Sequence, residues 1–86
     1  MSNKVLVKFG AEWCQPCKSL QSTIDSLGDE LKVDEIQYID IDVDTDAAKE
    51  YGIRGIPTLI LFEEGSEIKR TTGSLSAAAL KMFVGD

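Results

Sequence analysis

Histidine is absent from this chain of 86 residues, and cysteine occurs only twice. Without histidine, no imidazole can serve as a catalytic base or as a metal ligand. A structural zinc site needs four Cys or His ligands, so a chain with two cysteines and no histidine nearly excludes one. These absences leave few residue types that could carry out chemistry, and they draw attention to the two cysteines.

Long apolar segments are missing as well. No run approaches the roughly 18 apolar residues that a membrane-spanning helix needs. Charges and a glycine interrupt the apolar start of the chain, MSNKVLVKFG, so this segment lacks the layout of a signal peptide. We therefore expect a cytoplasmic protein that does not bind membranes.

Basic residues are outnumbered: 9 Lys and Arg stand against 15 Asp and Glu, which gives a net charge of −6. A nucleic-acid-binding protein needs a basic surface, so no nucleic acid is expected as a partner. Hydrophobic residues make up 43% and charged residues 28%, as in soluble globular domains, which argues against disorder. We expect residues 1–86 to form a single domain, and the net charge favours a monomer.

Apolar spacing predicts the first strand and the first helix. The run KVLVKF at residues 4–9 is short, apolar and contains β-branched residues, as strands do. After the cysteines, Leu20, Ile24 and Leu27 recur at helical spacing. Gly28 weakens the end of this helix, so we expect the helix to stop there.

The remaining sequence predicts further strands and helices. We expect a strand at residues 35–42, followed by a short helix within 44–52 that is capped by Asp44 or Thr45. A strand at 58–62, buried on both faces, should then lead through a turn at Glu64 and Gly65 into a strand at 66–73. The last element should be a helix that is capped by Ser76 and has Leu80 and Phe83 on its buried face. A helix between the first two strands implies a parallel pair, and the turn implies an antiparallel pair. The order β-α-β-α-β-β-α therefore predicts an α/β fold with a four-stranded mixed sheet flanked by helices.

Both cysteines lie in the stretch AEWCQPCKSL, where Cys14 and Cys17 fall on one side of a helix start. A disulfide between them would close a very short loop and would remove little chain entropy. The loop formula gives about 2 kcal/mol for four residues, against about 3 kcal/mol for fifteen. Stabilisation is therefore a poor explanation, and a reversible dithiol explains the pair better. The alternative is a pair of buried structural cysteines.

The position of the pair predicts different roles for the two thiols. Cys14 would sit at the N-terminal end of the helix, where free N–H groups favour a thiolate and should bring its pKa below the roughly 8.5 of free cysteine. Lys18 adds positive charge nearby. Cys17 is one turn deeper and should stay a thiol until a mixed disulfide forms. Pro16 suits the first helical turn, and Trp13 can cover the rim of the site.

The segment WCQPC resembles the active-site motif of thioredoxins, and YGIRGIPTLILF with a later TG resembles the rest of the thioredoxin signature. The resemblance runs from Lys4 onward and implies a thioredoxin-like fold that lacks the usual additional N-terminal strand and helix. It also implies that Cys14 attacks, that Cys17 resolves, and that Pro57 follows a cis peptide bond and sits against the dithiol.

The resemblance further implies a substrate-binding surface around the dithiol. The backbone of Ile56 would pair with an extended substrate segment, and Gly55 and Gly73 would leave room for that segment. Ordinary turn formation is the alternative for both glycines, and a trans proline that opens an edge strand is the alternative for Pro57. The same surface would include three residues of the cysteine motif: Trp13, Gln15 and Pro16.

Four positions depart from the usual thioredoxin pattern. Gln15 replaces a glycine, Gly10 an aromatic residue, Tyr38 a lysine, and Lys8 a buried carboxylate beneath the second cysteine. The Lys8 amine could snorkel to solvent. As a buried ammonium it would favour the thiolates and raise the reduction potential, and as a neutral amine it could take the proton of Cys17. Lys8 and Lys18 are thus candidates for tuning the thiol pKa values.

The acidic segment DIDVDTD resembles a calcium loop, but the spacing fails. Counted from Asp40, the sixth residue is Thr45, where the EF-hand needs a glycine, and the count from Asp42 fails in the same way. The pair Glu63 and Glu64 is most simply a solvated turn. We therefore expect no metal site.

These observations predict a thiol–disulfide oxidoreductase that reduces protein disulfides in the cytoplasm. The electrons would be carried by the Cys14–Cys17 disulfide itself, with no bound cofactor. The expected partners are disulfide-containing client proteins and, as the resemblance implies, an NADPH-dependent thioredoxin reductase as electron donor. Two alternatives stay open: a glutaredoxin-like protein reduced by glutathione, and a thioredoxin-fold binding subunit of a larger enzyme.

Overall fold

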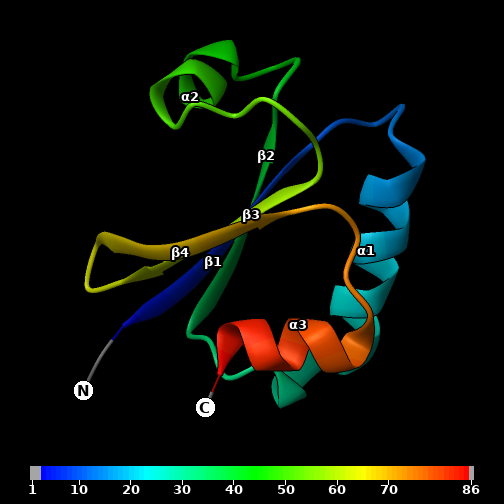
Figure 1. Ribbon diagram of the computed structural model, residues 1–86, viewed down its shortest axis with the longest axis vertical. Coiled ribbons are helices and arrows are strands. Elements are labelled where there is room, and N and C mark those ends of the chain that lie inside the picture. The colour runs from blue at the N-terminus through cyan, green and yellow to red at the C-terminus, as the bar shows by residue number, and fades with distance from the viewer. Residues whose placement is uncertain (1–2, 86) are drawn as a thin grey trace.

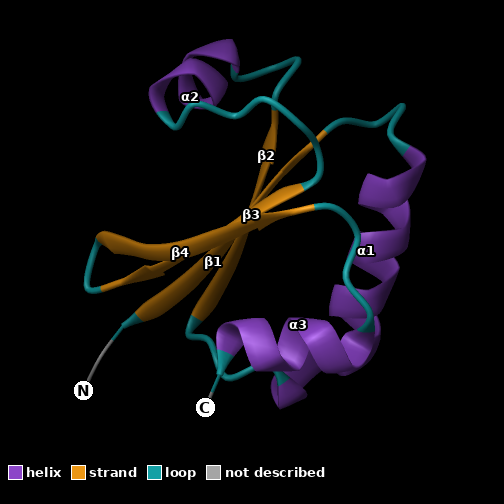
Figure 2. Cartoon of the chain, in the orientation of Figure 1, coloured by secondary structure: helices purple, strands orange, loops and turns teal. Residues whose placement is uncertain are grey.

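The computed structural model describes residues 3–85 of the chain. The elements follow in the order β1 (Lys4–Gly10), α1 (Gln15–Leu27), the short 3₁₀ helix η1 (Gly28–Glu30), β2 (Glu35–Asp40), α2 (Thr45–Glu50), β3 (Thr58–Glu63), β4 (Ser66–Thr72) and α3 (Ala77–Val84) (Figures 1 and 2). This order of strands and α-helices is the one that the sequence predicts, and η1 is an addition that sequence patterns did not indicate.

The four strands form one mixed sheet in the order β2-β1-β3-β4. β1 runs parallel to β2, with Val5 opposite Glu35. β3 runs antiparallel to both β1 and β4, and the register of β3 against β4 shifts between Leu61 and Phe62. The predicted parallel pair and the predicted hairpin are both confirmed.

The sheet separates two apolar layers, because alternate residues of a strand point to opposite faces. On one face, Leu59 and Leu61 of β3 pack with residues of α1 and α3, including Leu20 and Leu80. On the other face, Ile60 packs in a smaller cluster that also contains residues of β1 and α2. Figure 1 shows α1 and α3 together on one side of the sheet and α2 apart from them. The first face therefore holds the main core.

Helix ends are set by the side chains that the sequence pattern singled out. Gly28 has a φ of +51° and ends α1. The Asp44 carboxylate accepts a hydrogen bond from the Ala47 N–H at 3.0 Å and caps α2. The Ser76 hydroxyl does the same for α3 through the Ala79 N–H at 3.2 Å. Each cap satisfies a backbone donor that would otherwise lack an intrahelical partner.

One strand end and one buried position differ most from expectation. β2 ends at Asp40 rather than at residue 42, because an Asp40 carboxylate oxygen accepts a hydrogen bond from the Asp42 N–H at 2.8 Å and starts a turn. In α3, Leu80 is buried as expected, but Phe83 is only partly buried, and Val84 takes the deeper position at 2% exposure.

The edges of the sheet are β2 and β4. Glu64 and Gly65 join β3 to β4 with positive φ values of 53° and 81°, as a tight hairpin requires. On β4, Arg70 binds Glu67 through two hydrogen bonds of 2.7 and 2.8 Å and also donates to the Tyr51 carbonyl at 2.7 Å. These contacts tie the exposed strand β4 to the end of α2.

Within residues 3–85, no helix is both long and apolar enough to span a bilayer.

Candidate active site

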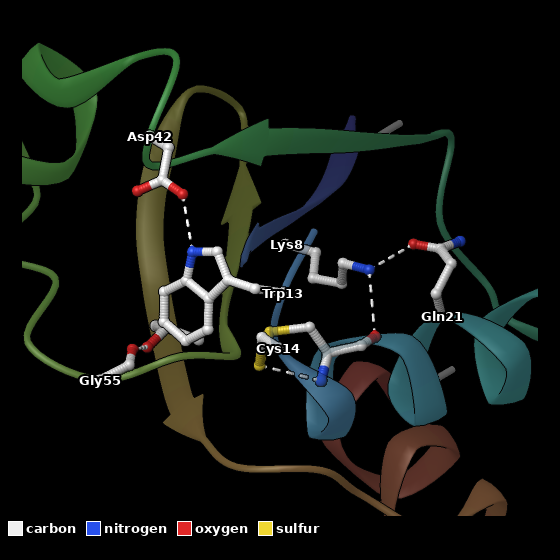
Figure 3. The surroundings of a disulfide bond; sticks show 8 residues. Lys8, Trp13, Cys14, Gln21, Asp42 and Gly55 are labelled. Carbon is white, nitrogen blue, oxygen red and sulfur yellow. Dashed lines mark hydrogen bonds between the residues drawn. A yellow bond between two sulfur atoms is a disulfide. The ribbon is translucent and has the colours of Figure 1, made fainter. Parts of the chain in front are cut away.

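The two cysteines are joined by a disulfide at the start of α1, directly after the turn that follows β1 (Figure 3). Their Cα atoms are 5.2 Å apart, within the range that a disulfide bridges. Cys14 is the N-cap of α1, and its Sγ accepts a hydrogen bond from the Cys17 N–H at 3.2 Å. The first turn of the helix therefore directs the Cys17 N–H, which has no intrahelical partner, at the Cys14 sulfur, as the sequence predicts.

Both cysteines are enclosed by the protein. Cys14 is 5% exposed and Cys17 is 2% exposed, so Cys17 is the more shielded of the two, but by a small margin. They form a buried cluster with Ala11, and the partly buried Ile41 and Ile56 pack against it. Only a small part of the Cys14 surface is therefore accessible from solvent.

Trp13 lies on the surface beside the disulfide with 67% of its area exposed. Its indole Nε1–H donates a hydrogen bond to an Asp42 carboxylate oxygen at 2.7 Å (Figure 3). Asp42 belongs to the turn between β2 and α2, and sequence reasoning missed this role. The position of Asp42 in the sequence could have indicated this contact. Because β1 and β2 are parallel, the loops that follow their C-terminal ends lie next to each other at the same end of the sheet.

The segment before β3 lies against the disulfide cluster through Ile56. The Ile56–Pro57 peptide bond is cis, as expected, and Pro57 is buried. The Thr58 hydroxyl donates to the Gly55 carbonyl at 2.6 Å, and the Gly73 N–H donates to the Pro57 carbonyl at 2.8 Å. These contacts place both Gly55 and Gly73 beside the predicted substrate-binding segment at Ile56 and Pro57.

The two glycines have different backbone requirements. Gly73 has a φ of +105°, which other residues rarely adopt, so turn geometry alone accounts for a glycine there. Gly55 has no such φ, and a Cβ at this position would meet only the Thr72 methyl, at 3.4 Å. Among the other predicted site residues, Gln15, Pro16 and Lys18 are exposed around the start of α1.

Lys8 is buried, with 3% of its surface exposed, so the expectation that its amine snorkels to solvent is wrong. Its side chain leaves β1 on the face covered by α1. The Nζ atom donates to the Gln21 side-chain oxygen at 2.6 Å and to the Cys17 carbonyl at 3.4 Å (Figure 3). It also lies 4.6 Å from the centre of the Tyr38 ring. Polar partners inside the protein thus replace the solvent that a snorkelling amine would reach.

Burial shifts the pKa values of both side chains in this contact. Desolvation lowers the pKa of the Lys8 amine, and the negative charge of Asp25 partly offsets this effect. Burial raises the pKa of the Tyr38 hydroxyl, and nearby carboxylates, of which Asp40 has the largest effect, raise it further. Asp25 is linked to Lys8 through Gln21, whose side-chain N–H donates to the Asp25 carboxylate at 2.9 Å.

A family model described as Thioredoxin matches residues 1–86. The chain belongs to the thioredoxin family. The thioredoxin of Chlamydia muridarum is 46% identical over 72 residues, which cover 84% of this chain and 71% of that protein. The thioredoxin of Mycolicibacterium smegmatis is 39% identical over 89 residues, which cover 99% of this chain and 79% of that protein.

Solved structures match the fold as well. A mutant thioredoxin from Halobacterium salinarum superimposes with a TM-score of 0.84 at 35% identity, over 95% of this chain and 72% of that chain. Trxlp from Edwardsiella tarda gives a TM-score of 0.87 at 27% identity, over 98% of this chain and 84% of that chain. Family membership and the bonded Cys14–Cys17 pair show that this chain is a thiol–disulfide oxidoreductase.

Three of the four departures from the thioredoxin pattern meet at one place, next to Cys17. Lys8 and Tyr38 contact each other there, and a Cβ on Gly10 would come within 3.1 Å of the Cys17 Sγ and 3.4 Å of the Tyr38 ring. An open cavity of about 750 Å³ reaches this place. Its lining residues are Lys8, Ala11, Glu12, Cys17, Lys18, Gln21 and Tyr38.

The acidic segments do not assemble into a metal site in the described part of the chain. Among residues 3–85, no three His, Cys, Asp or Glu side chains come close enough together to hold an ion. The aspartates instead accept hydrogen bonds within the protein. Asp40 accepts from the Asp42 N–H and Asp42 from the Trp13 indole. Asp44 accepts from the Ala47 N–H.

Proposed function

We propose that this member of the thioredoxin family reduces disulfides of client proteins, with Cys14 as the attacking thiolate and Cys17 as the resolving thiol. The Cys14 thiolate attacks one client sulfur, and the other client sulfur leaves and takes a proton. Cys17 then loses its proton and attacks the Cys14 sulfur, which breaks the mixed disulfide and releases the second client thiol. Two electrons pass to the client, and the Cys14–Cys17 disulfide forms.

The position of Cys14 supports these roles. The Cys17 N–H points at the Cys14 Sγ at 3.2 Å, at the end of α1 where the helix dipole is positive. A negative sulfur is stabilised there by the hydrogen bond and by the dipole together. Cys17 has no such position, because it lies inside the first turn. This hydrogen bond is the single observation on which the assignment of the attacking cysteine rests.

The segment around Pro57 supports binding of an extended client. Among residues 3–85, no hydrogen bond reaches the backbone N–H or carbonyl of Ile56, although Ile56 packs against the disulfide cluster. A client strand could pair with these two free groups while its disulfide lies over Cys14. In this arrangement Trp13, Gln15, Pro16, Gly55 and Gly73 would line the approach to Cys14.

The remaining parts of the proposal concern its setting. We take residues 1–86 to act as one domain, as a monomer in the cytoplasm. The family implies disulfide-containing clients and a thioredoxin reductase that draws its electrons from NADPH. A comparison of two reductants tests the donor: thioredoxin reductase with NADPH should reduce the oxidised protein quickly, whereas fast reduction by glutathione alone would favour the glutaredoxin-like alternative.

An insulin-reduction assay tests the reductase function directly. We expect the unaltered chain to accelerate the reduction of insulin by dithiothreitol, and Cys14→Ser to abolish this acceleration. The matched control is Ser19→Ala, which alters an exposed residue of α1 and should leave the rate unchanged. Insulin reduction by Cys14→Ser at the unaltered rate would overturn the proposal and would leave a binding role, which needs no thiol, as the better explanation.

A further inference from the structure

A buried amine lies directly beneath the resolving cysteine. Lys8 is 3% exposed, and its Nζ is 3.4 Å from the Cys17 carbonyl oxygen. Removing a charged amine from water is costly unless the protein replaces the lost hydration. The proposed exchange between Cys14 and Cys17 does not by itself need a lysine at this position. The contacts of the Lys8 amine therefore indicate whether the site holds the charged ammonium or the neutral amine.

Within residues 3–85, the polar groups that contact Lys8 Nζ all accept from it. The side-chain oxygen of Gln21 and the carbonyl of Cys17 accept its hydrogen bonds, and the Tyr38 ring presents its negative face at 4.6 Å. An ammonium has three donors and no acceptor, so these three partners match it. A neutral amine carries a lone pair that needs a donor, and none of these three contacts supplies one. The site is built for the charged form.

Gln21 fixes this arrangement through its own second contact. Its side-chain N–H donates to the Asp25 carboxylate at 2.9 Å, which leaves its oxygen to face Lys8. The opposite orientation of the amide would bring two donors together at Lys8 and two acceptors together at Asp25. Asp25 thereby orients the acceptor for Lys8 and contributes a negative charge that supports the ammonium.

The Lys8 ammonium lies close to Cys17, with its Nζ 3.4 Å from the Cys17 carbonyl oxygen. Lys8 and Cys17 line the same cavity, and Gly10 places no side chain between the strand and the Cys17 Sγ, which a Cβ would approach to 3.1 Å. Charges interact more strongly away from water than at the surface. The other charged or titratable groups that face this cavity are Glu12, Lys18 and Tyr38, and all of them are more exposed than Lys8.

We propose that the Lys8 ammonium is a buried counter-charge for the reduced cysteine pair and shifts the thiol–disulfide equilibrium toward the reduced form. This inference rests on the proposed Cys14–Cys17 exchange and deepens it. A positive charge stabilises the thiolate that reduction creates and does nothing comparable for the neutral disulfide. The oxidised chain is consequently a stronger oxidant than the same chain with a neutral side chain at residue 8.

The exchange with glutathione gives the balanced reaction in which this shift is measured. Two glutathione thiols supply two electrons, the Cys14–Cys17 bond breaks, and the sulfur–sulfur bond of oxidised glutathione forms. Of the two protons from glutathione, one stays on a cysteine of the protein and one goes to solvent. Cys14, the thiolate of the proposed exchange, is left ionised, and the Lys8 ammonium beside Cys17 stabilises its negative charge.

The test compares Lys8→Met, which keeps most of the side-chain length without the charge, with the unaltered chain in glutathione redox buffers at neutral pH. We expect the equilibrium constant for reduction to fall about tenfold, because a nearby opposite charge shifts a thiol pKa by roughly one unit or more. Tenfold corresponds to a reduction potential lower by about 30 mV for a two-electron couple. The matched control is Lys49→Met, the same change at an exposed site on α2, which should stay within about twofold.

A second measurement separates charge from packing. The pH profile of alkylation by iodoacetamide should move upward by about one unit in Lys8→Met, and the shift should persist at high salt because Lys8 is buried. A residue that only fills space would leave the profile where it is. Lys8→Gln, which is neutral but polar, should shift the equilibrium and the profile in the same direction, and circular dichroism checks that each variant folds.

The outcomes distinguish this inference from the proposed function. Equal equilibrium constants and equal pH profiles in Lys8→Met and the unaltered chain would overturn the counter-charge. An unchanged equilibrium constant with slower release of the mixed disulfide would also overturn it, because a neutral Lys8 that takes the Cys17 proton predicts that result. Failure of the unaltered chain to reduce insulin would instead contradict the proposed function, whatever the equilibrium with glutathione.

Discussion

The two sides of the Cys14–Cys17 disulfide differ in chemistry. On the outer side lie Trp13 and the Ile56–Pro57 segment, which follow the thioredoxin signature. On the inner side lie Lys8, Gly10, Gln21 and Tyr38, three of which depart from it. In Figure 3 the disulfide lies between Trp13 on one side and Lys8 with Gln21 on the other. If clients bind on the outer side and Lys8 sets the redox balance on the inner side, as we propose, mutations should change the two properties separately.

The largest expected effect is the difference between replacing Cys17 and replacing Cys14 by serine. Cys17→Ser should lose nearly all turnover and should accumulate a mixed disulfide with the client through Cys14, because the inner sulfur can no longer release it. Non-reducing gel electrophoresis followed by mass spectrometry measures this adduct. Cys14→Ser is the control and should form little of it. An adduct that forms mainly through Cys17 would reverse the assigned roles.

A smaller effect tests how tightly the inner side is packed. Gly10→Ala should destabilise the oxidised chain by about 1–3 kcal/mol, because its Cβ would lie 3.1 Å from the Cys17 Sγ and 3.3 Å from its Cβ. Gly55→Ala is the matched variant beside the outer side, where the nearest contact is 3.4 Å, and it should change stability by less than about 1 kcal/mol. Urea unfolding measures both. Equal losses would remove the contrast between the two sides.

The third prediction uses the lowered pKa of Lys8. Above the pKa of Lys8 in the folded chain and below its unfolded value near 10.5, the unfolded chain binds more protons at this residue. Rising pH in this window therefore favours the folded state, by about 1.4 kcal/mol per unit of pKa difference once the window is passed. The free energy of unfolding of the oxidised chain, measured relative to Lys8→Met, should accordingly increase between neutral pH and about pH 10. A difference that stays flat would show that Lys8 has an ordinary pKa.

Tyr38 has the opposite effect on the free energy of unfolding at the upper end of this pH range. Its pKa is raised above 10.0, so the unfolded chain loses the hydroxyl proton first and stability falls once the pH exceeds that value. Tyr38→Phe removes this fall without removing the ring that faces Lys8. Measuring Lys8→Met and the unaltered chain in the Tyr38→Phe background therefore isolates the contribution of Lys8.

The smallest expected effect concerns the outer side. Asp42→Ala removes the acceptor of the Trp13 indole at a largely exposed site, so the loss of stability should be about 0.5 kcal/mol. Asp42→Asn keeps an acceptor oxygen and should lose less. Neither variant should alter the equilibrium with glutathione, which depends on the inner side. A shift there as large as that of Lys8→Met would show that the two sides are coupled.

Local patterns in the sequence were sufficient for most of the fold. The spacing of Leu20, Ile24 and Leu27 predicted α1, and Gly28 marked its end, because both depend on neighbours along the chain. The position of Cys14 at the start of α1 followed from the same local signals. The attacking role of Cys14 stays a prediction until a variant is measured.

The surroundings of Lys8 could not be predicted in this way. Its burial depends on Gln21 of α1 and Tyr38 of β2, which meet it only after the sheet and the helix have packed. The Trp13–Asp42 hydrogen bond likewise joins residues 29 positions apart. The early end of β2 depends on one hydrogen bond that the Asp42 N–H donates to the Asp40 carboxylate, which competes with the strand pairing expected up to residue 42.

The exposed strand β4 has a consequence for behaviour at high concentration. An open sheet edge invites strands of other molecules, which is how fibrils begin to grow. Here Glu67, Lys69 and Arg70 are exposed along that edge. Arg70 already donates hydrogen bonds to the Glu67 carboxylate and to the Tyr51 carbonyl. The pairing register between β3 and β4 also shifts opposite these residues. An incoming strand would have to strip water from these charges and match an irregular ladder, so β4 resists the self-association that its open edge would otherwise allow.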